Sequence, residues 1–388
     1  MLINLLTPIF IFALGFLLVA SIKIGKKDKR YLNLLWIYHL LFSIFYYFYV
    51  LYKGGDAFGY WANAKEMTSA DFMDSFSGSQ GTEFMVALNY IPANLIGMNF
   101  FTNSLFFGLL GFIAFTFLYR ICLQTIPYNS KFFKFRLFPL LFFLPNLHFW
   151  SSGVGKDTML FLCISIVAYG FMRISKRFPL VLIGLLLSYG IRPHVTLILL
   201  VSFGFVYVIN GKISVLQRIF LVICLSVVAG LILPSVLEFT KMDELSIEDF
   251  EEFSDSLATG LSEAGSSTDL SSYPYPLKVL TFLYRPFFFD SNGIPAVVAS
   301  FENLLLLLLS IRVIRSRFFA TFKAAPFVIQ GLFLFFIMGA LVFSMSMSNL
   351  GIILRQRNMF LPGLILFILW SFSYTTKQKL ISKKRGNG

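Results

Sequence analysis

Long apolar runs, separated by short basic clusters, constrain the fold of this chain more than any other feature of its sequence. Of its 388 residues, 57% are hydrophobic and only 13% are charged. A soluble chain has about a quarter of its residues charged. Because this chain lacks the polar surface of a soluble protein, the sequence predicts an integral membrane protein whose spans are helical.

About eleven apolar runs predict helices that cross the bilayer. The first has no basic residue before it and a basic cluster directly after it, which indicates a membrane helix with an outer N-terminus and not a cleaved signal peptide. The sequence thus predicts one all-α membrane domain, residues 1–388, with short broken helices around an outward-facing cavity and a cytoplasmic C-terminus. The runs lie near residues 3–22, 32–52, 101–120, 137–150, 157–172, 179–191, 195–209, 215–235, 295–312, 325–344 and 358–374.

The distribution of charge supports this topology independently. Most of the 32 basic residues fall in loops on one side of the predicted helices, and of the 19 acidic residues only Asp28 joins them. By the positive-inside rule that side is cytoplasmic. The net charge of +13 therefore reflects membrane topology and not binding of nucleic acid.

Two longer segments, 53–100 and 236–294, fall on the outer side. In the first, the stretch 83–97 is apolar but interrupted by Asn89, Pro92 and Asn94, and we expect it to be interfacial or re-entrant. The second contains apolar residues at spacings of three and four between 247 and 261, which predicts an amphipathic helix.

An Arg-Pro-His turn separates two runs that are short for a bilayer. At about 1.5 Å per residue, runs 179–191 and 195–209 reach about 20 to 23 Å, whereas the hydrocarbon core is about 30 Å thick. Arg192 and His194 are therefore expected in a recess below the surface, where an ionisable group indicates a functional site. The alternative is an arginine at a helix end that reaches the interface.

Several other cations stand at the outer mouths of helices, where basic residues are scarce. The guanidinium and ammonium groups of such a cluster can hold the phosphate or diphosphate of a lipid. Each residue alone could equally serve as an anchor at the membrane interface. Glu302 lies inside a predicted span and is expected to pair with Arg285 or another outer arginine. The predicted anion-binding set is Lys156 beside Asp157 in SSGVGKDTM, Arg192, Arg285, Arg355 and Arg357.

Asp56 is the acidic residue best placed for catalysis. Gly54 and Gly55 before it allow a sharp turn, and Tyr60 and Trp61 follow closely. A carboxylate there could act as general base on a sugar hydroxyl, with the two aromatic rings as stacking faces. Equally, Asp56 could simply start a helix over 57–67. The sequence predicts neither a metal nor a cofactor, since the three cysteines have no metal spacing and GVGKD does not fit a nucleotide-binding loop.

Four elements of the sequence together resemble those of a known group. They are Gly54-Gly55-Asp56 with Tyr60, the SGVGKD turn, the outward Arg192-Pro193-His194 turn, and Arg355-x-Arg357 before the last helix. The chain resembles the bacterial O-antigen and exopolysaccharide repeat-unit polymerases, and its early outer Asp is similar to the acidic residue of the wider GT-C glycosyltransferases. The similarity covers most of the chain in layout but rests on few identities.

The resemblance implies a multi-pass protein of the bacterial cytoplasmic membrane that joins polyprenyl-diphosphate-linked oligosaccharides on the outer face, alongside envelope polysaccharide-assembly proteins. It implies that Arg192, Arg285, Arg355 and Arg357 hold the diphosphate while Asp56 approaches the acceptor in an inverting, metal-free transfer. The Asp-Glu or Asp-x-Asp pair of some GT-C enzymes is missing at Asp56, which leaves the base assignment open. Three alternatives stay open: transfer of a single sugar from a polyprenyl phosphate, transport of a lipid-linked saccharide, and a non-catalytic assembly role.

Overall fold

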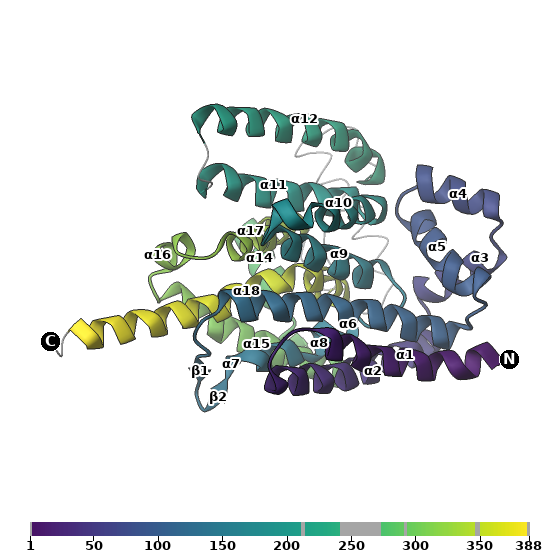
Figure 1. Ribbon diagram of the computed structural model, residues 1–388, viewed down its shortest axis with the longest axis horizontal. Coiled ribbons are helices and arrows are strands. Elements are labelled where there is room, and N and C mark those ends of the chain that lie inside the picture. Colours follow the sequence, from purple (N-terminus) through teal and green to yellow (C-terminus); the bar gives the residue numbers. More distant parts are fainter. Residues whose placement is uncertain (1, 211–213, 241–272, 291–292, 346–349, 386–388) are drawn as a thin grey trace. The chain divides into compact units, whose positions relative to one another are not determined.

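The computed structural model describes residues 2–210, 214–240, 273–290, 293–345 and 350–385 (Figure 1). Over these residues the chain is helical apart from turns and one two-stranded antiparallel hairpin, β1 (Lys131–Phe132) with β2 (Phe135–Arg136). Seven of the described helices are long and apolar enough to cross a membrane. The prediction of an all-α, multi-pass membrane protein is therefore confirmed at this level.

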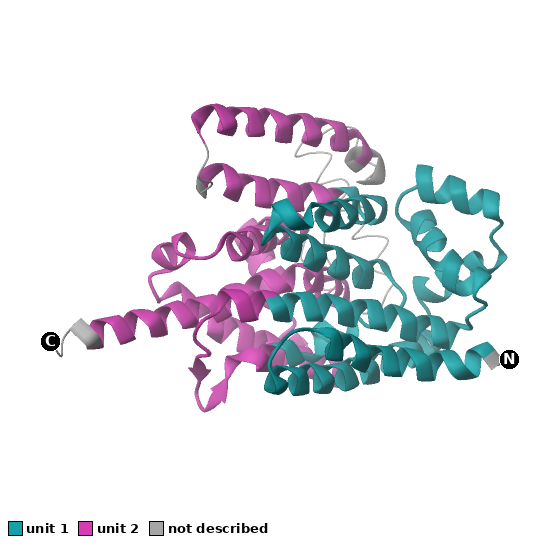
Figure 2. Cartoon of the chain, in the orientation of Figure 1, with its two compact units in different colours: residues 1–120, 142–193 teal, residues 121–141, 194–388 magenta. Residues whose placement is uncertain are grey.

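Contacts divide the chain into two compact units (Figure 2). The first unit comprises residues 1–120 and 142–193, and the second comprises residues 121–141 and 194–388. Contact density does not test whether the units fold independently, so the single domain over 1–388 stays a prediction.

The first unit holds the segments that carry Asp56, Lys156 and Arg192. Helices α9 and α10 follow each other closely in the chain and pack side by side, and α3, α4 and α5 pack together (Figure 1). Its elements are α1 (Leu2–Ser21), α2 (Lys26–Lys53), α3 (Asp56–Glu66), α4 (Ser69–Gly78), α5 (Thr82–Tyr90), the π-helical turn η1 (Ile91–Leu95), α6 (Phe100–Thr125, to Arg120), α8 (Pro145–Phe149), α9 (Lys156–Phe171) and α10 (Ile174–Ile191).

Glycines let the backbone of the turn before α9 pass close to its neighbours. A Cβ on Gly111 of α6 would lie 1.8 Å from the Ser151 carbonyl oxygen, and one on Gly108 would lie 2.9 Å from that of Ser152. A Cβ on Gly153 would lie 2.1 Å from the Tyr46 ring of α2. Only glycine fits such approaches, so these positions fix the path of the chain into α9.

In the second unit, α14 packs against α15, α17 and α18, and α17 packs along α18. One tyrosine and one tryptophan also join elements of this unit by hydrogen bonds. The Tyr275 hydroxyl donates to the Leu341 carbonyl, and the Trp370 indole N–H donates to the Thr321 carbonyl. The elements are α7 (Leu137–Leu140), η2 (Leu141–Phe143, only Leu141 in this unit), α11 (Pro193–Asn210, from His194), α12 (Val215–Thr240), α14 (Tyr275–Tyr284), η3 (Phe288–Asp290), α15 (Ile294–Ile314), α16 (Phe318–Lys323), α17 (Phe327–Phe343) and α18 (Leu350–Arg385).

The structure corrects several of the predicted spans. The helix predicted over 137–150 is wrong, because Pro139 and Pro145 interrupt that segment and it forms the short pieces α7, η2 and α8. The last span begins at Leu350 instead of 358 and runs on to Arg385. The amphipathic helix predicted within 246–261 lies outside the described residues.

Replacing Gly111 with alanine should destabilise the fold, because the new Cβ meets backbone, which cannot rotate away. We expect a loss of about 2 kcal/mol or more, the cost of overpacking. Thermal unfolding of the detergent-solubilised protein measures it. The matched control is Gly230→Ala on α12, where a Cβ meets nothing within 4 Å. Equal melting temperatures for the two variants would contradict the close packing of the turn.

Candidate functional site

The Arg-Pro-His turn joins α10 to α11. Helix α10 ends at Ile191, Arg192 is extended as expected before a proline, and Pro193 opens α11. Helix α10 begins at Ile174 but is kinked at Arg177, whose φ of −125° and ψ of 18° are not helical. Its continuous part, 178–191, reaches about 21 Å, which is shorter than the apolar core, so the depth of Arg192 in the membrane stays a prediction. Arg192 is also buried within protein, at 8% exposure.

Arg192 forms a buried ion pair with an acid at the start of α9. Its guanidinium lies 3.6 Å from the Asp157 carboxylate, and the two side chains are 9% and 5% exposed. This distance is longer than a direct hydrogen bond. Lys156 and Asp157 are the first residues of α9, not members of the preceding turn, and a carboxylate in a first helical turn is favoured by the helix dipole.

Lys156 extends this group toward α3 and α5. Its ammonium donates a hydrogen bond of 3.2 Å to the Thr82 hydroxyl of α5 and lies 6.0 Å from the centre of the Tyr60 ring of α3. The Gly81 N–H donates to the Gly190 carbonyl at 2.8 Å, which ties the start of α5 to the end of α10. Two cations and one acid are thus held together by three helices of the first unit.

Asp56 is exposed at the first position of α3, after two glycines with positive φ, 76° at Gly54 and 127° at Gly55. The glycines therefore make the sharp turn that the sequence predicts, and Asp56 starts the helix. Tyr60 is only 3% exposed, so little of its ring is open to a sugar, which argues against its expected stacking role. Trp61 is half-buried and donates to the Met98 carbonyl at 2.9 Å.

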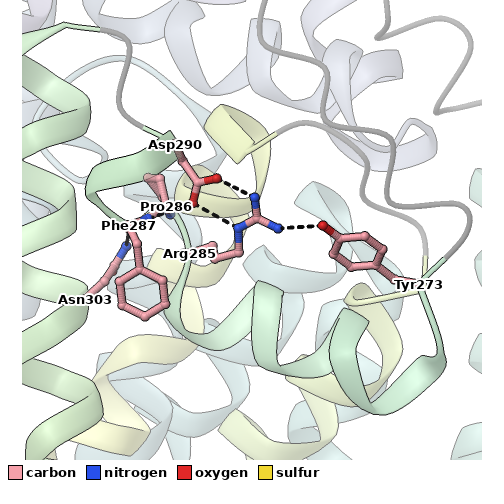
Figure 3. Close-up of polar contacts among 6 residues, drawn as sticks. All are labelled: Tyr273, Arg285, Pro286, Phe287, Asp290 and Asn303. Carbon is pink, nitrogen blue, oxygen red and sulfur yellow. Dashed lines mark hydrogen bonds and ion pairs between the residues drawn. The ribbon is translucent and has the colours of Figure 1, made fainter.

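In the second unit, Arg285 pairs with Asp290 across a short loop (Figure 3). Its Nε donates to the carboxylate at 2.9 Å, a second nitrogen donates to the other oxygen, and Nη1 donates to the Tyr273 hydroxyl at 3.3 Å. These bonds to Asp290 raise the pKa of Arg285 above its ordinary value, although burial opposes them. Burial raises the pKa of Asp290, but hydrogen bonds from Arg285 and the Phe287 N–H outweigh it, so that pKa lies below its ordinary value.

Arg357 is engaged by backbone carbonyls and by one side chain. It is 1% exposed and donates to the Leu283 carbonyl at 2.6 Å, to two neighbouring carbonyls, and to the Asn303 side chain at 2.6 Å. Carbonyls at a helix end lack partners within the helix, and Arg357 supplies them for α14. This placement favours a structural role over the expected grip on a diphosphate.

The remaining predicted residues also lie in the second unit. Glu302 is 5% exposed on α15 and interacts electrostatically with Arg357, while the observed partner of Arg285 is Asp290. Arg355 is half-buried on α18, and the His194 ring lies 5.6 Å from that of Phe343. Among the described residues, no three His, Cys, Asp or Glu side chains lie close enough to hold a metal ion.

Sequence reasoning did not identify Thr82, Tyr273 or Asp290, whereas Asn303 stands out beside Glu302 as a polar residue inside a predicted span. Asp290 had a detectable signal, since it is the first acid after Arg285 and a proline-containing loop of five residues can bring the two together. Thr82 had none, because its partner Lys156 is 74 residues away in the chain. The partner of Asn303 was hidden for the same reason, since Arg357 is 54 residues away.

The ion pair of Asp290 predicts a specific pH dependence of stability. A carboxyl with a depressed pKa in the folded state stabilises the fold above its unfolded value of 3.8, and this contribution is lost as the pH falls through the lower folded value. We expect Asp290→Asn to lower the free energy of unfolding by about 1 to 2 kcal/mol at pH 7, with the difference from wild type shrinking below about pH 4.

Thermal unfolding in detergent between pH 7 and pH 3 measures this difference. Asp74→Asn, at an exposed position of α4, is the matched control and should match wild type throughout. A destabilisation by Asp290→Asn that stays constant down to pH 3 would contradict the ion-pair origin.

Comparison of the chain with protein-family models, with curated proteins and with solved structures found no match. The resemblance to oligosaccharide repeat-unit polymerases therefore stays a hypothesis. The support for it comes from the chemistry of the side chains described above.

Proposed function

We propose that this chain is a membrane glycosyltransferase that joins polyprenyl-diphosphate-linked oligosaccharide repeat units on the outer face of the bacterial cytoplasmic membrane. One observation carries the proposal: Lys156, Asp157 and Arg192 form a polar cluster where α9 begins and α10 ends. A buried arginine is costly unless it has a use or a partner, and the topology rule disfavours cations on the outer side.

The proposed topology has an outer N-terminus, a cytoplasmic C-terminus and eleven crossings. One crossing must then be made by residues 137–155, which form short pieces and not a helix. Irregular backbone is tolerated at membrane depth where it is buried in protein. The turn 151–155 at the end of this segment meets that condition, since Ser151, Ser152 and Val154 are fully buried and the Thr158 hydroxyl donates to the Gly153 carbonyl at 2.6 Å.

In the proposed reaction, a hydroxyl of the acceptor sugar attacks the anomeric carbon of the donor. The new glycosidic bond forms as the bond from that carbon to the diphosphate oxygen breaks, and the acceptor proton passes to Asp56. Lys156 and Arg192 hold the departing diphosphate, because its charge grows as the bond breaks. Arg285 and Arg355 stay candidates from the sequence alone. The engagement of Arg357 by backbone leaves it a supporting role.

Arg192→Ala should abolish polymer formation while the protein stays folded in the membrane. Removing one donor that stabilises developing charge costs about 100-fold or more in rate. The measurement is polysaccharide length on gels, in cells whose own copy of the gene is deleted and replaced by the variant. Wild type should restore long polymer, and Arg192→Ala should leave single repeat units on the lipid.

Arg173→Ala, at an exposed arginine between α9 and α10, is the matched control and should restore long polymer. Full-length polymer from Arg192→Ala would contradict the role of Arg192. Loss of one sugar from each repeat unit, with polymer length unchanged, would favour a single-sugar transferase instead.

A further inference from the structure

Two histidines of the first unit meet inside the protein, in a place that the proposed reaction does not use. His39 of α2 and His148 of α8 are each 0% exposed, and their Nδ1 atoms lie 2.8 Å apart. Each ring also contacts backbone through its other nitrogen. The His39 Nε2 lies 3.0 Å from the Gly108 carbonyl oxygen, and the His148 Nε2 lies 2.6 Å from that of Phe142.

Counting protons shows that two neutral rings cannot make these three hydrogen bonds. A carbonyl oxygen only accepts, so each Nε2 must carry a hydrogen. The contact between the two Nδ1 atoms needs a third hydrogen. A neutral imidazole carries one N–H, so two neutral rings supply two hydrogens for three bonds. One bond is therefore missing unless the pair holds an additional proton.

Rotating a ring does not remove the shortage. A half-turn of either imidazole about its Cβ–Cγ bond would put carbon where nitrogen now contacts the other ring at 2.8 Å and would remove its carbonyl contact. Moving the single hydrogen of His39 from Nε2 to Nδ1 would leave a lone pair of Nε2 facing the Gly108 oxygen at 3.0 Å. Moving the hydrogen of His148 in the same way would leave a lone pair of its Nε2 facing the Phe142 oxygen.

Burial opposes a charge at this place, and three features of the surroundings act in the opposite direction. Three backbone carbonyls, of Gly108, Ser151 and Phe142, face the two rings and favour the charged form. The Phe115 ring stacks on His148 at 4.3 Å, nearly parallel at 7°, within the distance of about 6 Å at which an aromatic face attracts a cation. Sharing the proton between two rings spreads the charge, and such charge-assisted bonds are strong.

The other neighbours are aromatic or hydroxyl groups. The rings of Tyr38 and Phe42 of α2 lie 4.8 and 5.9 Å from that of His148, and Tyr38, which is the titratable member of this set, donates to the Phe143 carbonyl. On α6, Phe112 lies 6.4 Å from His39. The Ser43 hydroxyl donates to the His39 carbonyl.

We infer that His39 and His148 form a proton-binding site, in which one additional proton is held between the two Nδ1 atoms. The bound proton completes the bonds that tie α8 to α2 and α6. Since α8 leads through the buried turn into Lys156, the proton helps to fix the chain before α9. The site takes a proton and not a metal, because it offers two ring nitrogens that face each other at hydrogen-bond distance.

Nitrogen NMR of the full-length protein in lipid bilayers tests this inference. The chain has only three histidines, so labelling histidine with ¹⁵N gives six ring-nitrogen signals, and His194→Gln identifies the two from His194. Protonated and bare ring nitrogens are well separated in such spectra. At pH 7 we expect both Nε2 atoms to be protonated and the two Nδ1 atoms to share the third proton. The shared proton gives either one protonated and one bare Nδ1 signal or two signals at intermediate shifts, with a ¹⁵N–¹⁵N coupling between the two Nδ1 atoms.

Two protonated and two bare nitrogens at pH 7 would overturn the inference, since the pair would then be neutral. In His148→Gln we expect His39 to become an ordinary neutral ring, with one protonated and one bare nitrogen. A His39 ring that stays doubly protonated in that variant would also overturn the shared proton. If the variant does not fold, the count of protonated nitrogens in the wild-type pair still decides the question.

Discussion

Polar groups inside this protein need partners within it, because apolar side chains and lipid supply none. The buried polar groups of the described residues show how the chain meets this constraint. Arg192 lies against Asp157, Arg285 against Asp290, and Arg357 against the carbonyls that end α14. An unsatisfied charge or carbonyl at these places would cost several kcal/mol. The same requirement applies to the histidine pair and identifies the proton that completes its bonds.

Close backbone packing provides the geometry for these partners. The turn before α9 runs so near α2 and α6 that glycine is required at Gly108, Gly111 and Gly153. Because the turn is fixed, Lys156 and Asp157 start α9 at a defined position beside the end of α10. The N–H of Gly81, bonded to the carbonyl of Gly190, adds α5 to the same assembly. A cluster that spans three helices can then hold its shape without a ligand.

Much of the helical structure could be predicted from the sequence, because hydrophobic run length is a local signal. It located most of the helices and the Arg192 turn correctly. The segment 137–150 misled the prediction, since its composition is that of a membrane helix while Pro139 and Pro145 interrupt it. Composition predicts an apolar environment but not a continuous helix.

The site was predicted less completely, because its partners are distant in sequence. The sequence identified Lys156, Asp157 and Arg192 as exceptional, and the structure brings these three together. The sequence could not show that Arg357 donates to backbone carbonyls or that Tyr60 is buried, since both depend on which helices pack together. Asp56 is where the sequence places it, exposed at the start of α3, and its role as a base stays a prediction.

The central claim is that the Lys156 and Arg192 cluster binds a lipid diphosphate. Native mass spectrometry of the purified protein, with undecaprenyl diphosphate and undecaprenol added at equal concentration, tests it most directly. The two lipids share their hydrocarbon chain and differ in the anionic headgroup. The account predicts that the diphosphate binds at least about tenfold more tightly, a difference of about 1.4 kcal/mol. Equal occupancy by the two lipids would contradict it.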